Sequence, residues 1–468
     1  ESGLRINDHE MVISSDRVVG ISIPKDPKTE DAALVLKPIR VNSGQTARFT
    51  FVYCGGETID STPATLDNAL RAREDAEAYW RHVDLPYGRV TVPDAGVQAL
   101  IDGAIRNIWQ AREIKNGLPA FQVGPTCYRG LWIVDGSFLL EAAAMLGAGD
   151  QARAGIEYML SFQKEDGRFE IMDKYHKENG IVLWACSRHA QLTQDKTWLE
   201  SEWPKLVRTV DYIERLRQDT LANDTPLDDG LMPPGFADGG IGRSNLLEYT
   251  NVYWNLLGLK SIVQAARWLG KEEEAKAWEQ EYEDFYAKFR GAIQRDTRSD
   301  VHGNRFLPIL MTPDDNVLAS PDAHWYIASK GQWGFCHGVY PGQLFEKDDP
   351  LVAGNLAMLK SYEQEGMVVS TGWMTGGIWN YFASFYAHAW LWNGDGKKAG
   401  ECLYAMADHA SPLLAWREEQ VLKGQPYKQV GDMPHNWASA EFIRLAVHLL
   451  AIDRGSELHL LEGMPAAW

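Results

Sequence analysis

Several patterns that mark common protein classes are absent from this 468-residue sequence. No apolar run reaches the roughly 18 residues that a transmembrane helix needs, so we expect no membrane span. Basic residues are outnumbered, since 46 Lys and Arg face 64 Asp and Glu and leave a net charge of −18. This excess of negative charge argues against nucleic acid or an anionic membrane as a partner.

Signatures of metal sites are absent as well. The 12 histidines show no HxH or HExxH spacing, so metal catalysis has no support in the sequence and we expect no cofactor. The cysteines include no CxxC pair, which argues against a zinc ribbon or a thioredoxin motif. Scattered cysteines are usually buried thiols. Their odd number excludes complete pairing within the chain and leaves the compartment open; they are Cys54, Cys127, Cys186, Cys336 and Cys402.

Aromatic residues, by contrast, are abundant, with 18 Trp, 18 Tyr and 15 Phe. Aromatic rings stack on the faces of sugars, so this composition favours a carbohydrate ligand, although large helical cores also use Trp. The length allows one large helical toroid or two to three smaller domains.

Residues 1–62 are predicted to form strands, because apolar and polar residues alternate at 17–23 and 47–53. We interpret them as the C-terminal part of a β-sandwich domain. Its beginning would lie in a missing N-terminal segment or on a second chain that completes the sandwich. Residues 63–93 are interpreted as a helical linker.

From residue 94 to residue 468, helical periodicity alternates with loops rich in Gly, Pro and Asp. Short turns typical of αα-hairpins join helices in pairs at 146–150, 269–272 and 392–397, and long loops separate the pairs. About six hairpins fit, which predicts a mainly α protein with an (α/α)6 catalytic barrel. An open solenoid is the alternative, but its loops would be more uniform. The expected helices are 95–114, 136–147, 150–163, 180–192, 197–216, 247–269, 271–292, 350–363, 377–392, 396–409 and 437–452, with a further one near 333–346.

One stretch, Pro226–Asn255, combines features of a sugar pocket. Its first half is a loop, because two prolines and several glycines prevent a helix, and it carries Asp238. Its second half begins an aromatic helix at Tyr249. A carboxyl group on such a loop can transfer protons beside rings that stack on a sugar, but the stretch can equally be a long surface connection.

Three loops in this order resemble those of the six-hairpin glycosidases, which include glucoamylases, maltose-type phosphorylases, trehalases and α-L-rhamnosidases. The resemblance covers residues 94–468, and members commonly carry a β-sandwich ahead of the toroid. The first loop is YRGLWIVDGSF at 128–138. In glucoamylase-like members such a loop places an Asp on the hydroxyls of the terminal sugar, a role that the resemblance gives to Asp135, with Trp132 and Arg129 beside it. Asp135 can instead be a helix N-cap.

The second loop implies a general acid. Phosphorylase-like members carry theirs on a Gly- and Pro-rich loop before a Tyr-Thr-Asn sequence, which is Tyr249–Asn251 here. The match implies that Asp238 is the acid, although the relatives have Glu there. Rival carboxyl groups are those of Asp135, Asp228, Asp229 and Glu248.

The third loop implies a catalytic base. Residues 415–420 read AWREEQ, and a helix start follows at 437–439. Glucoamylases place their base in an Ala-Glu-Gln segment here, which points to Glu419. Rhamnosidases use a Trp-Glu pair, which points to Glu418. We place Glu419 ahead, and a solvated charge run is the alternative to both.

Other loop residues are expected to line the sugar site. Trp373 and Trp379 are the best candidates for stacking on a sugar, Tyr249 begins the aromatic helix, and His435 precedes the last helix and can bond a hydroxyl. Ordinary packing is the alternative for each.

The resemblance implies an inverting, exo-acting glycosidase that removes a terminal sugar from an oligosaccharide or polysaccharide. Such an enzyme needs one protonated carboxyl group and one ionised carboxylate. A glycoside phosphorylase on the same fold and a catalytically silent carbohydrate-binding subunit are the alternatives. A polysaccharide lyase fits less well, because lyases need cations and this chain is acidic.

Overall fold

The computed structural model describes residues 38–48, 65–223, 225–311 and 327–468, together with the backbone of five short strands before residue 54. Contacts within the chain separate two compact units, Glu1–Asp84 and Leu85–Trp468. Each unit is described by itself. In the described residues, no helix is both long and apolar enough to cross a membrane.

The first unit contains two small antiparallel sheets and one helix. One sheet has the order β1-β2-β5, and β3 pairs with β4 across a bulge. Strands β3 and β5 fall where alternation predicted strands, but a complete β-sandwich stays a prediction. Helix α1 belongs to this unit and buries none of its side chains. The elements are β1 Ser2–Ile6, β2 His9–Ile13, β3 Val18–Ser22, β4 Ala33–Leu36, β5 Phe51–Tyr53 and α1 Leu66–His82.

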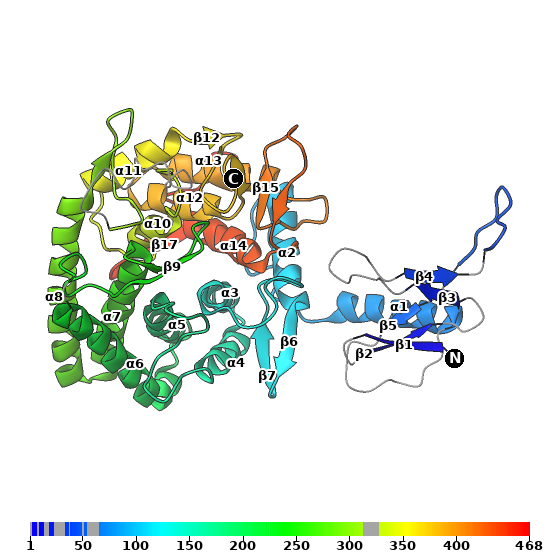
Figure 1. Ribbon diagram of the computed structural model, residues 1–468, viewed down its shortest axis with the longest axis horizontal. Coiled ribbons are helices and arrows are strands. Elements are labelled where there is room, and N and C mark those ends of the chain that lie inside the picture. The colour runs from blue at the N-terminus through cyan, green and yellow to red at the C-terminus, as the bar shows by residue number, and fades with distance from the viewer. Residues whose placement is uncertain are drawn as a thin grey trace. The chain divides into compact units, whose positions relative to one another are not determined.

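The second unit is mainly helical, and its described helices form an inner and an outer ring (Figure 1). Each inner helix packs on the next, and the last, α14, packs on the first, α3. This contact closes the ring and excludes the open solenoid. The inner helices are α3 Ile133–Met145, α5 Lys177–Thr193, α7 Tyr249–Leu269, α10 Trp333–Val339, α12 Phe382–Trp392 and α14 Asn436–Leu450. The outer helices are α2 Ala95–Gln110, α4 Gly149–Leu160, α6 Lys196–Ala222, α8 Glu272–Asp296, α11 Pro350–Lys360 and α13 Gly396–Asp408.

Connection length determines where the loops gather. Short connections follow the inner helices, whereas every long loop joins an outer helix to the start of the next inner helix. All long loops therefore lie at the N-terminal ends of the inner helices, which we call the cup mouth; the opposite end is the far mouth. The long loops carry the paired strands β6 Arg112–Lys115 and β7 Leu118–Phe121, β8 Gly235–Ala237 and β9 Arg243–Leu246, β10 Arg298–Ser299 and β11 Arg305–Phe306, and β12 Glu363–Gln364 and β13 Met367–Val368. They also carry the sheet of β14 Gly377–Trp379, β15 Glu419–Val421 and β16 Gln429–Val430.

Burial explains which helices are inner and how they end. The inner helices are buried on nearly every side, as expected of core helices that are apolar all round. Four outer helices, α2, α6, α11 and α13, begin at an Asp whose side chain accepts backbone amides. In the described structure only one inner helix has a side-chain cap, from Glu248 on α7.

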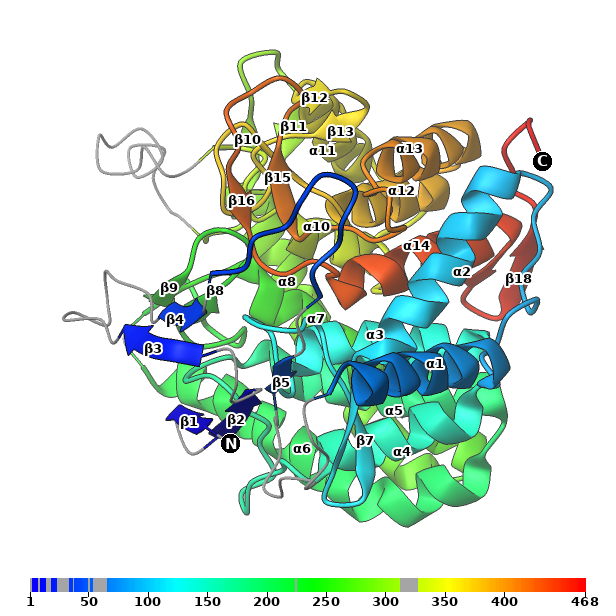
Figure 2. The same ribbon diagram turned by 90° about the vertical axis from the view of Figure 1, so that its right-hand side faces the viewer.

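Several expected helices differ in their bounds: for example, the one expected at 95–114 ends at Gln110 before β6, and the one expected near 333–346 ends at Val339. The helix expected at 377–392 begins only at Phe382, because Gly377–Trp379 pair with β15. The helix expected at 437–452 ends at Leu450 and continues as β17 Ala451–Arg454, which pairs with β18 Glu457–Leu460 (Figure 2). Of the cysteines, Cys186, Cys336 and Cys402 are buried thiols as predicted, Cys127 is an exposed thiol, and Cys54 lies outside the described residues.

A pair of glycines sets the distance between inner helices α5 and α7. A Cβ atom on Gly180 would lie 2.0 Å from the carbonyl oxygen of Trp254, and one on Gly258 would lie 2.5 Å from the Cα of Gly180. Only glycine allows the two backbones to approach this closely.

We therefore expect Gly180→Ala to destabilise the protein by about 1–3 kcal/mol, because the added methyl group must push two inner helices apart. Gly291→Ala on α8 is the matched control, since no atom lies within 4 Å of its added Cβ. That substitution should leave the thermal midpoint unchanged or raise it, because Ala is the better helix former. Equal thermal midpoints for both variants would contradict the close α5–α7 contact.

Candidate active site

Carboxyl groups from three separate loops and helices gather at the cup mouth. They belong to Asp135 on α3, Asp238 between β8 and β9, and Glu418 just before β15. Burial raises the pKa of Asp135 well above its usual range, and the charges of Asp238 and Glu418 raise it further. Burial also raises the pKa of Glu418 to about 7. Hydrogen bonds from Tyr128 and Trp373 lower this pKa, whereas the charges of Glu419 and Asp238 raise it. The three groups thus lie within one another's electrostatic field.

Asp135 lies inside the first turn of α3 and is almost fully buried. The N-cap position belongs to Trp132, and no side chain caps this helix. The N-cap interpretation of Asp135 is therefore wrong, and its buried carboxyl group is not needed to start the helix.

The two neighbours predicted beside Asp135 differ in their surroundings. Trp132 is half-buried and packs edge-to-face on Tyr128, with ring centroids 5.3 Å apart. Arg129 is exposed and forms an ion pair with Glu113 on β6. Trp132 thus packs on the residue that bonds Glu418, whereas the guanidinium of Arg129 is engaged with the β6–β7 hairpin.

Asp238 is held on the turn between β8 and β9. Its carboxyl group accepts hydrogen bonds from the Tyr175 hydroxyl and, at 2.7 Å, from the Gly239 amide. A Cβ on Gly240 would lie 2.0 Å from the carbonyl oxygen of Gly372, so this glycine lets the turn pack directly on the loop that carries Trp373.

The rival carboxyl groups on this stretch have other surroundings. Glu248 caps α7 by accepting the amides of Thr250 and Asn251. Asp228 is fully buried and accepts a hydrogen bond from Asn223 at 3.2 Å. Asp229 is exposed. None of the three is among the charges that raise the pKa of Asp135 or Glu418.

Glu418 and Glu419 are adjacent but differently bound. Glu418 accepts hydrogen bonds from the Tyr128 hydroxyl at 2.9 Å and the Trp373 indole at 3.1 Å, both through Oε1. Its Oε2 is buried and has no partner in the described structure. Both oxygens of Glu419 accept backbone amides, from Trp373 at 2.8 Å and Met374 at 3.0 Å. Burial raises the pKa of Glu419 to about 7, while these amides and Lys330 lower it.

The residues predicted to line the site do not all reach it. Trp373 is 37% exposed and directs its indole N–H to Glu418, so its ring is available at the cup. His435 is fully buried between Tyr381 and Tyr128, and neither ring nitrogen has a partner in the described structure. Burial lowers the pKa of His435 to about 3, so the ring is neutral.

Trp379 and Tyr249 are core residues. Trp379 is 4% exposed and packs among Tyr381, Phe382 and Phe385. Tyr249 is fully buried, and its hydroxyl donates to Asp296 at 2.6 Å. An inner helix is covered on all sides, so an aromatic residue at its start need not face the cup.

Two further residues of the site were not predicted. Glu178 lies fully buried in the first turn of α5. It accepts the amide of Ile171 at 2.7 Å through Oε2, while its buried Oε1 has no partner in the described structure. Burial raises its pKa to about 8, and the charge of Asp238 contributes. Lys177 is also fully buried, and its ammonium group donates to the carbonyl of Phe236, two residues before Asp238. A Lys-Glu pair is common at the start of a helix, so the sequence did not mark these two residues as part of the site.

Asp432 clamps the loop that carries Tyr128. Its carboxylate accepts the amides of Cys127 at 3.0 Å and Tyr128 at 2.9 Å, as well as the amide and hydroxyl of Thr126. Burial raises the pKa of this carboxyl group, but the donors outweigh burial and lower it. The clamp fixes Tyr128, whose hydroxyl in turn holds Glu418.

We expect Asp432→Asn to destabilise the protein by about 1.5–3 kcal/mol near neutral pH, because hydrogen bonds to a charged acceptor are lost. Since the folded-state pKa is lowered, this stabilisation is complete above the unfolded-state pKa of about 3.9 and is lost as the pH falls through the folded-state pKa. Thermal midpoints of wild type and variant should converge in acid. Asp408→Asn, at an exposed position on α13, is the control and should leave the thermal midpoint unchanged at both neutral and acidic pH. A difference in thermal midpoint between wild type and Asp432→Asn that persists in acid would contradict the clamp.

Residues that could hold a metal ion do not gather in the described part of the chain, where no three His, Cys, Asp or Glu side chains form such a group.

Comparison with known proteins also indicates a six-hairpin glycosidase fold. Residues 173–376 match the family model of the bacterial alpha-L-rhamnosidase 6 hairpin glycosidase domain. An uncharacterized glycosyl hydrolase of Methanocaldococcus jannaschii is 21% identical over 164 residues, which cover 32% of this chain and 26% of that protein. The match thus spans about a quarter of that relative.

Solved structures share the fold at low sequence identity. A glycosidase variant in complex with glucose is 17% identical, has a TM-score of 0.58, and the match covers 76% of this chain and 97% of that one. A rhamnosidase from Klebsiella oxytoca with rhamnose bound is 13% identical, with a TM-score of 0.52 and coverage of 79% and 66%. The chain therefore carries the six-hairpin glycosidase fold, and its resemblance to that superfamily is confirmed.

Proposed function

We propose that this protein is a glycoside hydrolase that removes a terminal sugar from an oligosaccharide or polysaccharide. The observation that carries the proposal is the pair Asp238 and Glu418. These carboxyl groups come from different loops of the cup mouth, the charge of Asp238 raises the pKa of Glu418, and the exposed Trp373 bonds Glu418. Two such groups are what cleavage of a glycosidic bond requires.

In this proposal Asp238 is the general acid and Glu418 the general base. Asp238 gives its proton to the leaving oxygen. Glu418 removes a proton from a water molecule that attacks the anomeric carbon, and the anomeric configuration inverts. Oε2 of Glu418 accepts no hydrogen bond in the described structure and so keeps acceptor capacity for a water molecule, which supports this role.

The hydrogen bonds favour Glu418 over Glu419 as the base, the reverse of the order that we placed first from the sequence. Both oxygens of Glu419 are bound by the backbone of the Trp373 loop. We propose that Glu419 fixes that loop, and with it the Trp373 ring, against the sugar.

Asp135 is proposed to bind hydroxyl groups of the terminal sugar. Burial and the charges of Asp238 and Glu418 raise its pKa, which favours the protonated form that can donate a hydrogen bond. The same property makes Asp135 the rival acid, so the two assignments need an experiment that separates them.

Exo action is supported by the packing below the cup. The ring of His337 lies 5.0 Å from Phe138 and 4.4 Å from Phe385, and Phe138 stacks on Trp437 at 5.3 Å. These rings fill the axis of the helical ring. A site with a closed floor admits the end of a chain and excludes its middle.

Phosphorolysis on the same fold is the second enzyme candidate. Two adjacent carboxylates at Glu418 and Glu419 would repel a phosphate nucleophile, which favours water. Turnover that depends on inorganic phosphate would instead place phosphorolysis ahead of hydrolysis.

We expect Asp238→Asn and Glu418→Gln each to lower kcat on an oligosaccharide by about 10²–10⁴-fold. Glu419→Gln should cost less, because it disturbs a loop and no proton transfer. On an aryl glycoside whose leaving group needs no protonation, the acid variant alone should recover activity, and Asp135→Asn is tested beside Asp238→Asn. If Asp135→Asn recovers activity in place of Asp238→Asn, Asp135 is the general acid and Asp238 the sugar-binding residue. If the wild-type protein binds sugar without turnover, it is a silent binding subunit.

The Tyr128 hydroxyl predicts a change in pH dependence. It donates to Glu418 and lowers the pKa of that carboxyl group, which burial has raised to about 7. Tyr128→Phe removes the donor, so the pKa should rise. Because the base works only when ionised, the acidic limb of kcat/KM should move to higher pH. A limb that stays in place would contradict Glu418 as the base.

A further inference from the structure

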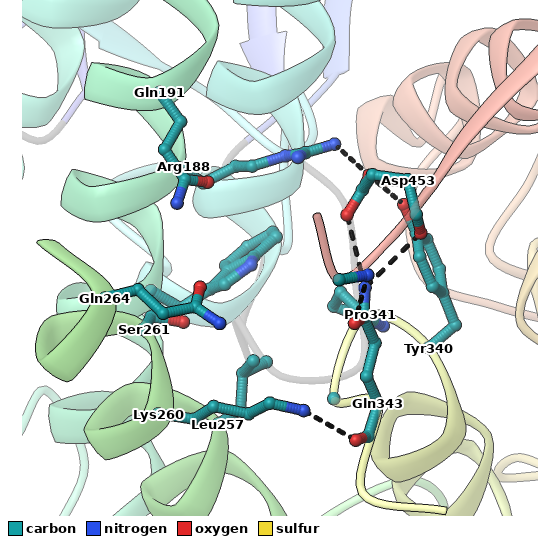
Figure 3. A pocket seen from close by; sticks show the side chains of 13 residues that line it. Arg188, Gln191, Leu257, Lys260, Ser261, Gln264, Tyr340, Pro341, Gln343 and Asp453 are labelled. Atoms are coloured by element: carbon teal, nitrogen blue, oxygen red, sulfur yellow. Dashed lines mark hydrogen bonds and ion pairs between the residues drawn. The ribbon is translucent and has the colours of Figure 1, made fainter. Parts of the chain in front are cut away.

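The far mouth of the helical ring contains a small polar cavity. It has a volume of about 70 Å³ and is bordered by the later turns of α5 and α7, the residues after α10, and the β17–β18 turn (Figure 3). The carboxyl groups of the cup lie at the opposite ends of these helices. Polar side chains that line the cavity include Arg188, Lys260, Ser261, Gln264, Gln343 and Asp453.

The acidic side chain in this lining is already neutralised. Asp453 accepts hydrogen bonds from Arg188 at 2.9 Å, Tyr340 at 2.9 Å and Gln343 at 3.2 Å (Figure 3). Burial raises the pKa of Asp453, but the charge of Arg188 and these donors lower it overall. Arg188 is also paired with Glu141 at 2.7 Å. Among the groups that line the cavity, Arg188 therefore balances Asp453, while Glu141 does not line the cavity and is paired with Arg444 as well.

Lys260, in contrast, forms no ion pair with a carboxylate of the described residues. Its ammonium group donates to the backbone carbonyl of Gln343 at 2.7 Å (Figure 3). Burial lowers its pKa to about 8, although the charge of Glu346 opposes this shift. A half-buried cation beside one carbonyl retains donors for a ligand of opposite charge.

Neutral donors surround this cation. In the described structure the side chains of Gln191, Ser261 and Gln264 form no hydrogen bond with the protein, and all three border the cavity. Figure 3 shows the Gln264 amide directed from α7 towards the loop of Gln343. Amide and hydroxyl groups can all donate to the oxygens of one small ligand.

The size and the walls of the cavity limit that ligand. The cavity volume of about 70 Å³ is well below the roughly 300–1,000 Å³ of pockets that enclose drug-sized ligands. The rings that border it are buried, Trp184 at 4% and Tyr340 at 2% exposure, so no ring face is open for a sugar. The cavity fits a compact oxyanion and does not fit a sugar ring.

We propose that the far mouth is a binding site for one small oxyanion, a phosphate, sulfate or carboxylate, held by Lys260 with Gln191, Ser261 and Gln264. The site is separate from the proposed catalytic cup and does not depend on the assignment of the acid or the base.

The test is calorimetric titration of the full-length protein with inorganic phosphate, sulfate and acetate in turn, at ionic strength held constant with chloride. We expect saturable binding of one anion per chain for at least one of them. Lys260→Met should abolish it, and Gln264→Ala should weaken it by about tenfold, which corresponds to about 1.4 kcal/mol.

Lys276→Met, at an exposed position on α8, is the matched control and should bind like wild type. If Lys260→Met lowers the thermal midpoint, Gln264→Ala carries the test alone, since its side chain is exposed and unbonded in the described structure. Absence of binding by all three anions would overturn the proposal. Binding that both variants retain would also overturn it and would assign the anion to another site, such as the cup.

Discussion

One buried ion-pair cluster joins the end of the helical ring to its beginning. Arg444 on α14 is 1% exposed and bonds Glu141 on α3 at 2.5 Å and Glu441 on its own helix at 2.7 Å. Glu141 also bonds Arg188 on α5. Burial raises the pKa of Glu141, but the two guanidinium groups outweigh it and lower it overall. Buried pairs often add little net stability, and their clearest use is to fix one arrangement. Here they fix the register in which α14 meets α3, and so the closed ring.

Ring closure explains why the two mouths differ. Because each short turn follows an inner helix, all long loops meet at the inner N-termini, where Asp135, Asp238 and Glu418 come together. The far mouth has only short connections and the β17–β18 turn, and its cation Lys260 lies in a small cavity. Aromatic rings fill the axis between the two ends. One end of the helical ring thus carries acidic residues on long loops, and the opposite end has a small cavity with a basic residue.

The sequence predicted the ring well because its signal is local. Helical periodicity and the turn residues at 146–150, 269–272 and 392–397 are each contained in a few neighbouring positions. The site is harder to predict. Adjacent residues at a strand point to opposite faces, so sequence alone does not decide whether Glu418 or Glu419 faces the cup. The bond from Asp432 to Thr126–Tyr128 joins segments about 300 residues apart, and no local pattern reveals it. The prediction that Tyr249 lines the sugar site was wrong because an inner helix has no exposed face.

The most direct test of the central claim is a crystal structure with a non-hydrolysable analogue of the terminal sugar bound. The account predicts that the anomeric carbon lies between Asp238 and Glu418, with a water molecule on Oε2 of Glu418. The two carboxyl groups should be about 6.5–9.5 Å apart, the spacing of an inverting pair. A sugar bound with its anomeric carbon away from both groups, or a water held by Glu419 in place of Glu418, would contradict it.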